Sequence, residues 1–425
     1  MCRGIDHGNR RCPSDTNEAR RLRDHNLKAK RMYSPLLMER TEPHFLTVEE
    51  VAPVTELDPA SSIKADIAAL KTLEDPKEID ITINRIGSGI ENLAETKFGA
   101  PADIVIADAV KIERTARLAA AEVFQKRVTE AIALNQSTEA ELLATGINYQ
   151  THSFNAEREK AWEKTYPEKY AVLVAAREEQ KAAAAAFAAF KKDLPDIETL
   201  PSTALFRKRN QAIHLALEEA GVEFANPNTL NITENSHAGA TKTLKEALAF
   251  YPQRWIDNSN AHSLKTGSPL QVKKSNGRAH YSDGNDGHST AELTITSTDT
   301  GTHVGGGPGV SIALHEFAHR VEDTTPRIKQ YEDAFLKRRA GFFDGSDEKP
   351  SNIYVGRATE KGYKDNFSSH YMGKVYDNGS REILSMGMET LFAGTHDSFL
   401  GSDEYAPDVD YKRFVLGVLA SSAGE

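Results

Sequence analysis

A change of composition near residue 200 constrains the fold of this chain more than any other feature. From about Ser61 to Leu194 the apolar residues recur at helical spacing, and the final part is rich in Ala, Glu and Lys. Beyond Pro201 the residues Gly, Asn, Ser and Thr and the aromatic residues become frequent. The sequence therefore predicts an α+β protein in which a mainly helical N-terminal region precedes a domain with a small antiparallel or mixed sheet.

Three parts follow from this pattern. Residues 1–55 are expected to form a basic arm with a short helix, which begins at a capping box of Asp15 and Glu18. Residues 56–200 are expected to form an elongated helical bundle or coiled coil, and residues 201–425 a second domain. In that domain the pattern predicts strands over 272–274, 279–282 and 291–298 and helices over 204–220, 241–250, 327–340, 381–392 and 410–419.

Composition excludes several classes of protein. No apolar run approaches the roughly 18 residues that span a bilayer, so no membrane segment is expected. The first thirty residues lack the apolar core of a secretory signal. We therefore expect a cytoplasmic protein, with association with a virion or export without a signal as alternatives.

The charge is unevenly distributed. The net charge is −10, which argues against general binding of nucleic acid. The first forty residues contain ten Lys and Arg against five Asp and Glu, so contact with nucleic acid is expected only through this arm, if at all. A solvated basic helix is the simpler interpretation. Cys2 and Cys12 are too few for a disulfide framework, and with His7 they lack a fourth zinc ligand, which favours two free thiols.

The segment from His315 to His319 reads His-Glu-Phe-Ala-His. On a helix, residues four apart lie on one face, so both imidazoles point the same way. Neutral imidazoles are good ligands for zinc, and the intervening Glu316 can reach a water bound to the metal. Zinc lowers the pKa of such a water to roughly 7, after which a carboxylate helps it attack a carbonyl group.

The flanks of this segment support a helix. Five apolar residues cluster opposite the two histidines, and a glycine-rich run over 305–309 precedes the helix and allows it to begin cleanly. The five are Val310, Ala313, Leu314, Phe317 and Val321. The alternative is a chance occurrence of two His and one Glu at this spacing on a solvated face.

The region from Val304 to Phe392 resembles the zincin metallopeptidases, in which an edge strand and a His-Glu-x-x-His helix precede a second helix. Glu322 and Thr325 stand where the metzincin pattern needs Gly and His, and the Asn-Glu pair of thermolysin-type enzymes is absent. The segment from Arg381 to Glu389 is instead similar to the ligand helix of anthrax lethal factor-like peptidases. That resemblance implies Glu382, 63 residues after His319, as the third zinc ligand.

Two other ligands stay open. Glu389 lies two helical turns after Glu382 on the same face, so it is either the ligand itself or a partner for a ligand histidine. Asp377 is a weaker alternative because Gly373–Asp377 faintly resembles the Asp-type zincins. The lethal factor-like enzymes also use a tyrosine before the ligand Glu to stabilise the oxyanion, which implies Tyr376 in that role, with His370 or Tyr371 as alternatives.

These resemblances imply a zinc-dependent peptidase that acts on a protein or peptide. Its substrate is expected to lie extended along an edge strand near 293–298. The segment Leu248–Trp255 and the strands after it are also similar to zincin domains of phage head-morphogenesis proteins. That similarity implies two alternatives. One is a structural or injected prophage protein whose zincin domain is accessory or inactive, with virion or host protein partners. The other is an effector or toxin protease.

Overall fold

Proline begins five of the helices, because it has no N–H group to leave unpaired and its φ angle is already helical. These helices are α2 (Pro59–Leu70), α3 (Pro76–Thr96), α6 (Pro167–Lys192), α7 (Pro201–Glu219) and α11 (Pro326–Arg339). Asp75 adds a side-chain cap to α3, where its carboxylate accepts the N–H groups of Lys77 and Glu78 at 2.9 and 3.0 Å.

A computed structural model provides the structure of the protein. It describes residues 58–145, 155–194, 200–275, 279–283, 291–296, 309–353, 360–363, 369, 371–376, 379–393, 399–400 and 407–424. The predicted basic arm, its short helix, Cys2 and Cys12 lie outside these residues. The described residues belong to one compact unit, Leu57–Glu425. Within them, no helix combines the length and the apolar character that crossing a membrane requires.

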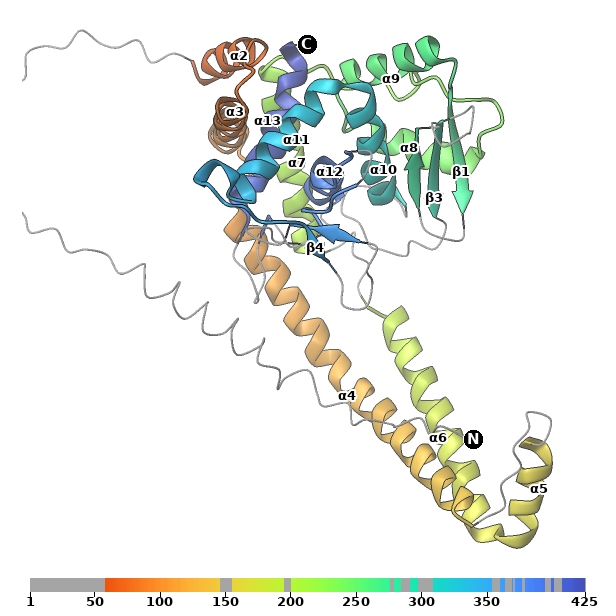
Figure 1. Ribbon diagram of the computed structural model, residues 1–425. Helices are drawn as coiled ribbons and strands as arrows, with labels where there is room; N and C mark the ends of the chain where they lie inside the picture. The colour runs from red at the N-terminus through yellow and green to blue at the C-terminus, as the bar shows by residue number, and fades with distance from the viewer. Residues whose placement is uncertain are drawn as a thin grey trace, which may run out of the picture. The chain divides into compact units, whose positions relative to one another are not determined.

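Helices α4 (Asp103–Leu143) and α6 form an antiparallel hairpin, and α5 (Asn155–Thr165) lies between them in the chain (Figure 1). Few side chains are buried in it. Phe124 stacks on Phe190 with ring centroids 4.7 Å apart, and Asn135 donates to Gln180 at 2.6 Å. Near the far end of the hairpin, Trp162 is buried with Leu142 and Leu173 in a small separate cluster.

Helices α2 and α3 belong instead to the main core, where α3 packs closely on α13 (Val409–Ser421). The close approach depends on glycine. A Cβ atom added at Gly87 would lie 1.8 Å from the carbonyl oxygen of Arg413, and one added at Gly417 would lie 2.1 Å from that of Ile83. The helical region predicted over 56–200 therefore divides by packing. Helices α2 and α3 lie within the main core, whereas the hairpin buries side chains in two small clusters, one of which it shares with α7.

The described strands form a mixed three-stranded sheet and a short two-stranded ribbon. The order of the larger sheet is β1-β3-β2, with β1 parallel and β2 antiparallel to β3. Its strands are β1 (Leu270–Ser275), β2 (His280–Ser282) and β3 (Ala291–Thr296), and the ribbon pairs β4 (Ser351–Asn352) with β5 (Lys361–Gly362). The mainly helical α+β class and the three predicted strands are confirmed. The interpretation of β3 as an edge strand is wrong, since β3 lies between the other two.

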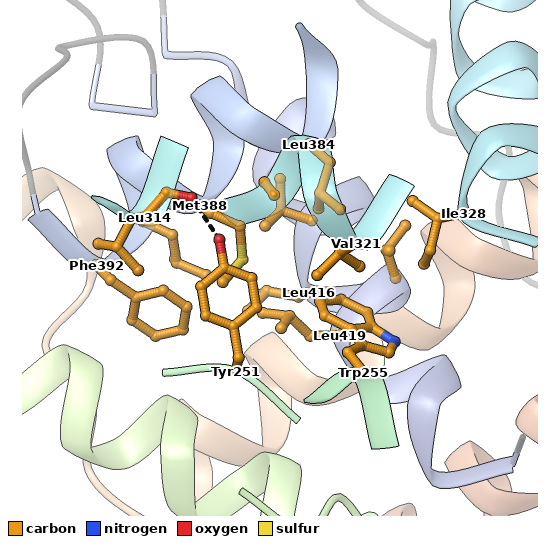
Figure 2. Close-up of a cluster of buried hydrophobic side chains, with 14 of the residues drawn as sticks. Tyr251, Trp255, Leu314, Val321, Ile328, Leu384, Met388, Phe392, Leu416 and Leu419 are labelled. Atoms are coloured by element: carbon orange, nitrogen blue, oxygen red, sulfur yellow. Dashed lines mark hydrogen bonds between the residues drawn. The ribbon is translucent and has the colours of Figure 1, made fainter. Parts of the chain in front are cut away.

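Helix α10 (Val310–Thr324) contacts both β3 and the helices α8 (Ala238–Leu248) and α9 (Gln253–Thr266). Figure 2 shows the apolar cluster on its inner side, where the Tyr251 hydroxyl donates to the carbonyl of Leu314 beside Trp255 and Val321. The sequence pattern does not predict helix α9. Its buried face includes Ser259 and Ser263, so its apolar periodicity is weak.

The chain after α11 returns to this core. A short helical turn (Phe342–Asp344) follows α11, and α12 (Ile383–Met388) continues directly into a π-helical turn over Glu389–Ala393. Helix α13 ends in another short turn, Ser422–Gly424. The predicted helix over 381–392 is therefore present as two kinds of helix, with Glu382 as the residue before the first. The predicted helices over 204–220, 241–250, 327–340 and 410–419 are confirmed within about two to three residues at most ends.

Candidate metal centre

Helix α10 begins where the sequence predicts it to begin. Gly309 is its N-cap and has φ 89°, a left-handed conformation that glycine adopts without strain. The five predicted apolar residues are buried at 0–2 % exposure. On the opposite side, the His315 and His319 side chains keep 18 and 14 % of their surface exposed. The helix thus presents both imidazoles on an accessible face and anchors the other face in the core.

One carboxylate oxygen lies between the two imidazoles. Glu382 Oε2 is 3.1 Å from Nε2 of His315 and 3.3 Å from Nε2 of His319. His315, His319 and Glu382 each offer one possible ligand atom, and these three atoms all lie within 4.8 Å of one another. Ligands at about 2.0–2.1 Å from a tetrahedral zinc are separated by about 3.3 Å. The three residues could therefore hold a metal ion, and the two separations from Glu382 are close to those of tetrahedral zinc ligands.

The outer nitrogens of both rings also face carboxylates. Glu389 Oε2 lies 3.2 Å from Nδ1 of His315, and Glu322 Oε2 lies 3.6 Å from Nδ1 of His319. Carboxylates at this position orient metal-binding imidazoles and make them more basic. Glu389 thus takes the partner position that the sequence left open, on the side of the ring away from Glu382. Glu322 was not predicted to have a role, although its spacing of three residues after His319 is a usable signal.

Glu382 is almost fully buried and divides its contacts between its two oxygens. The Tyr376 hydroxyl donates to Oε1, and the Ser385 hydroxyl donates to Oε2 at 3.0 Å. The structure therefore brings Tyr376 to the predicted ligand, on the oxygen that faces away from the histidines. His370 and Asp377 lie outside the described residues.

Lys374 is a cationic residue beside the site, and the sequence did not predict a role for it. Its ammonium group lies 3.1 Å from the Tyr371 hydroxyl and 4.3 Å from the centre of the Tyr376 ring. It also pairs with Glu360 at 3.4 Å. Lys374 therefore contacts both tyrosines at the wall of the site.

Burial and charge shift the protonation of these groups. Burial alone would lower the pKa of His315, but its hydrogen bonds to Glu382 and Glu389 outweigh that effect and raise the pKa to about 9. Burial would raise the pKa of Glu382, but the two histidines hold it well below its usual range. For Glu316, burial is dominant and raises the pKa, although both histidines act against it. A carboxyl group with a raised pKa is suited to accept and return a proton near neutral pH.

A cleft of about 560 Å³ runs along this face of α10. Its walls include the two histidines, Glu316 and Glu382, together with strand β2 and Tyr376. Within the part of the chain that the structure describes, strand β2 pairs only with β3 and is therefore the edge strand beside the site. The sequence favoured β3 as the edge strand for a simple reason. The strongest alternating pattern belongs to the central strand, whereas β2 has only three residues.

Arg320, which sequence reasoning did not single out, fixes this edge strand to α10. Its guanidinium is fully buried and donates to Ser259 and Ser263 of α9 and, at 3.1 Å, to the Tyr281 hydroxyl of β2. Such a group must be hydrogen-bonded to be tolerated inside a protein. The partners are distant in sequence, so no local pattern indicates them.

Comparisons of the chain with protein-family models, curated proteins and solved structures found no match in any of the three. The functional interpretation therefore depends on the geometry of these side chains.

Proposed function

We propose that this protein is a zinc-dependent peptidase with a zincin-type catalytic domain. The observation that carries the proposal is the position of Glu382 Oε2, about equally close to Nε2 of His315 and Nε2 of His319. Two imidazoles and one carboxylate leave one tetrahedral position of zinc for water or substrate, as catalytic sites require. The helix, the mixed sheet with its edge strand and the later helix support a zincin-type arrangement.

In this proposal His315, His319 and Glu382 hold zinc, which supplies a Lewis acid that polarises a carbonyl group and acidifies water. Glu389 would accept a hydrogen bond from Nδ1–H of His315, and Glu322 lies 3.6 Å from Nδ1 of His319, so both carboxylates favour the tautomer that leaves Nε2 for the metal. Glu382 contributes a negative charge, and the Ser385 hydroxyl holds its Oε2 atom in place.

Glu316 takes the proton from the attacking water and returns it to the leaving amine. Its place in the same cleft as the ligands and its raised pKa support this role. The Tyr376 hydroxyl is the proposed donor to the oxyanion, because it reaches the ligand carboxylate from the cleft wall and burial keeps it protonated by raising its pKa.

A peptide substrate would lie extended beside β2. Among the described residues β2 pairs only with β3, so its other edge could take an added strand, and His280, Tyr281 and Ser282 line the cleft next to the histidines. Substrate recognition thus relies on β2 in place of the strand near 293–298 that the sequence favoured.

The test is Glu316→Gln in the full chain. Zinc should remain at near-unit stoichiometry by elemental analysis, while cleavage of a peptide library falls by a factor of about 10² to 10⁴, because the variant loses only the proton acceptor. Glu382→Ala is the matched control, and it should lose zinc and activity together. Unchanged cleavage by Glu316→Gln would refute this mechanism.

The same experiment separates the peptidase from a structural role. A wild-type protein that binds zinc but cleaves nothing in the library, and that co-purifies with capsid or portal protein, would favour an accessory zincin domain. An effector protease is instead indicated if expression arrests growth of a host cell only when Glu316 is intact.

A further inference from the structure

The short segment that carries Glu382 is held by buried side chains from three other helices. Glu322 of α10 accepts the backbone N–H of Arg381 at 2.9 Å, and Glu332 of α11 accepts the backbone N–H of Leu384 at 2.8 Å. These two amide groups lie on either side of Glu382 in the chain. The carboxylates thus determine the path of the backbone immediately before and after the proposed ligand.

Two further contacts complete the attachment. The Arg381 guanidinium donates to Asp333 of α11 at 3.1 and 2.8 Å, and the Tyr411 hydroxyl of α13 donates to the carbonyl of Ile383 at 2.6 Å. Each of the residues 381, 383 and 384 is therefore tied to a helix in the main core. A ligand on so short a helix has little local structure of its own to hold it.

Burial of the Glu322 and Glu332 side chains costs free energy of folding. Glu322 is 2 % exposed and Glu332 is 0 % exposed. Glu332 Oε2 has no hydrogen-bond partner among the described residues. Buried carboxyl groups with incomplete pairing cost free energy, and an apolar residue of similar size is often as stable or more so. Stability alone therefore does not account for them.

Glu322 also reaches the metal centre directly. Its Oε1 atom holds the Arg381 amide, while its Oε2 atom lies 3.6 Å from Nδ1 of His319. A single side chain thus connects the helix of the two histidines to the segment of the carboxylate ligand. A change in the distance between them would alter the separation of Nε2 and Oε2, which zinc requires to be about 3.3 Å.

We infer that Glu322 and Glu332 are positioning residues, which fix the backbone on both sides of Glu382 so that its carboxylate meets both imidazoles. Neither touches the metal or the substrate. The inference rests on the proposed zinc centre, but it does not require that the protein cleaves peptides.

The experiment measures the zinc Kd of the full chain by competition with a chelator. Glu332→Leu keeps the volume but removes the acceptor of the Leu384 N–H, so zinc should bind about 10- to 100-fold more weakly. Glu332→Gln keeps an amide oxygen at that position and should stay within about threefold of the wild type. Glu322→Gln has one oxygen for two contacts and should bind several-fold more weakly.

Asp80→Asn is the matched control for general destabilisation. Asp80 is 3 % exposed and accepts from Arg338, so it stabilises the same helix α11 without contacting residues 381–384. It should lower the melting temperature and leave the zinc Kd unchanged. A second readout is the visible spectrum of the Co²⁺-substituted protein, which should change in Glu332→Leu and Glu322→Gln but not in Asp80→Asn.

Wild-type zinc affinity in both Glu332→Leu and Glu322→Gln would overturn the inference, as would a loss of affinity that follows melting temperature in all variants, Asp80→Asn included. If Glu332→Leu does not fold, the near-isosteric Glu322→Gln decides by its Kd and spectrum. A wild-type protein that binds zinc without cleaving peptides would defeat the proposed function and leave this inference standing. A wild-type protein that binds no zinc would defeat both.

Discussion

The α4–α6 hairpin and the region around α10 use their apolar residues in opposite ways. On α4, Ile112 and Val123 are 70 and 72 % exposed, whereas the apolar residues on the inner face of α10 are completely buried. Polar pairs also join the two long helices of the hairpin, such as Arg127 with Glu179, whose side chains are 50 and 44 % exposed. Exposed pairs of this kind contribute little free energy.

The two tryptophans, Trp162 and Trp255, are both 0 % exposed, but their surroundings differ. Trp255 lies in the main core next to Tyr251, with ring centroids 6.1 Å apart. Trp162 lies in the small hairpin cluster under the guanidinium of Arg158, at 4.7 Å. Although the two tryptophans are equally buried, they need not contribute equally to the stability of the site.

The largest effect is expected for Trp255→Ala, which should lower the free energy of unfolding by about 3–5 kcal/mol because it leaves a cavity in the main core. Trp162→Ala should open only the far end of the hairpin. Denaturant unfolding followed by circular dichroism measures the loss in Trp255→Ala, and the fluorescence of Trp255 reports the core transition in Trp162→Ala. The transition that Trp255 reports should keep its midpoint in Trp162→Ala, and the zinc Kd should not change.

The opposite result is informative too. An equal shift of the Trp255 transition in Trp162→Ala would mean that hairpin and core unfold as one cooperative unit. The contrast between the two regions would then be one of packing and not of stability.

Local sequence signals predicted most of the elements, since their causes are local. Proline starts, apolar periodicity and alternating strands indicate α7, α10, α11, α13 and the mixed sheet. Helix α9 was not predicted because it buries serines against Arg320, a partner that is far away in the chain. The order of the strands was not readable either. It depends on which strand pairs on both sides, and the three residues of β2 carry no pattern.

The candidate site was predictable to a similar extent. Residues four apart on one helix must share a face, which fixed His315 and His319. Glu382 and Glu389 are two turns apart, so spacing alone could not separate them. Only the three-dimensional arrangement shows that one faces Nε2 of both rings and the other faces Nδ1 of His315. Glu332 has no signal in the sequence, because its contact with the Leu384 N–H crosses 52 residues.

The stability of the main core, which carries the site, should depend on pH through His315. In the metal-free protein the pKa of His315 is raised to about 9, from about 6.5 in an unfolded chain. The stability from this shift is fully present below pH 6.5 and is lost as the pH rises through 9. We expect the main transition to lose roughly 3 kcal/mol over this range. Urea unfolding followed by Trp255 fluorescence in Trp162→Phe measures it.

Zinc binding should also depend on pH, but in the opposite sense, since a rise in pH should strengthen it. The metal needs a neutral imidazole, so binding at pH 7.5 should release protons and the Kd should rise as the pH falls below 9. Calorimetry in two buffers of different ionisation enthalpy measures the release. Glu389→Gln removes one of the carboxylates that raise the pKa of His315, so it should release fewer protons, and it serves as the control. A pH-independent Kd between pH 6.5 and 9 would contradict the assignment of His315 as a ligand with a raised pKa.

The smallest effect is expected on the hairpin surface. Ile112→Gln replaces an apolar side chain that is 70 % exposed, so it should change the free energy of unfolding by no more than about 0.5 kcal/mol. The matched substitution Ile83→Gln places an amide at a position that is 0 % exposed between α3 and α13, and it should destabilise the protein by several kcal/mol. Thermal unfolding followed by circular dichroism compares the two. A large loss in Ile112→Gln would mean that this face of α4 is covered in solution, and the hairpin would then have to be counted as an interface instead of an exposed arm.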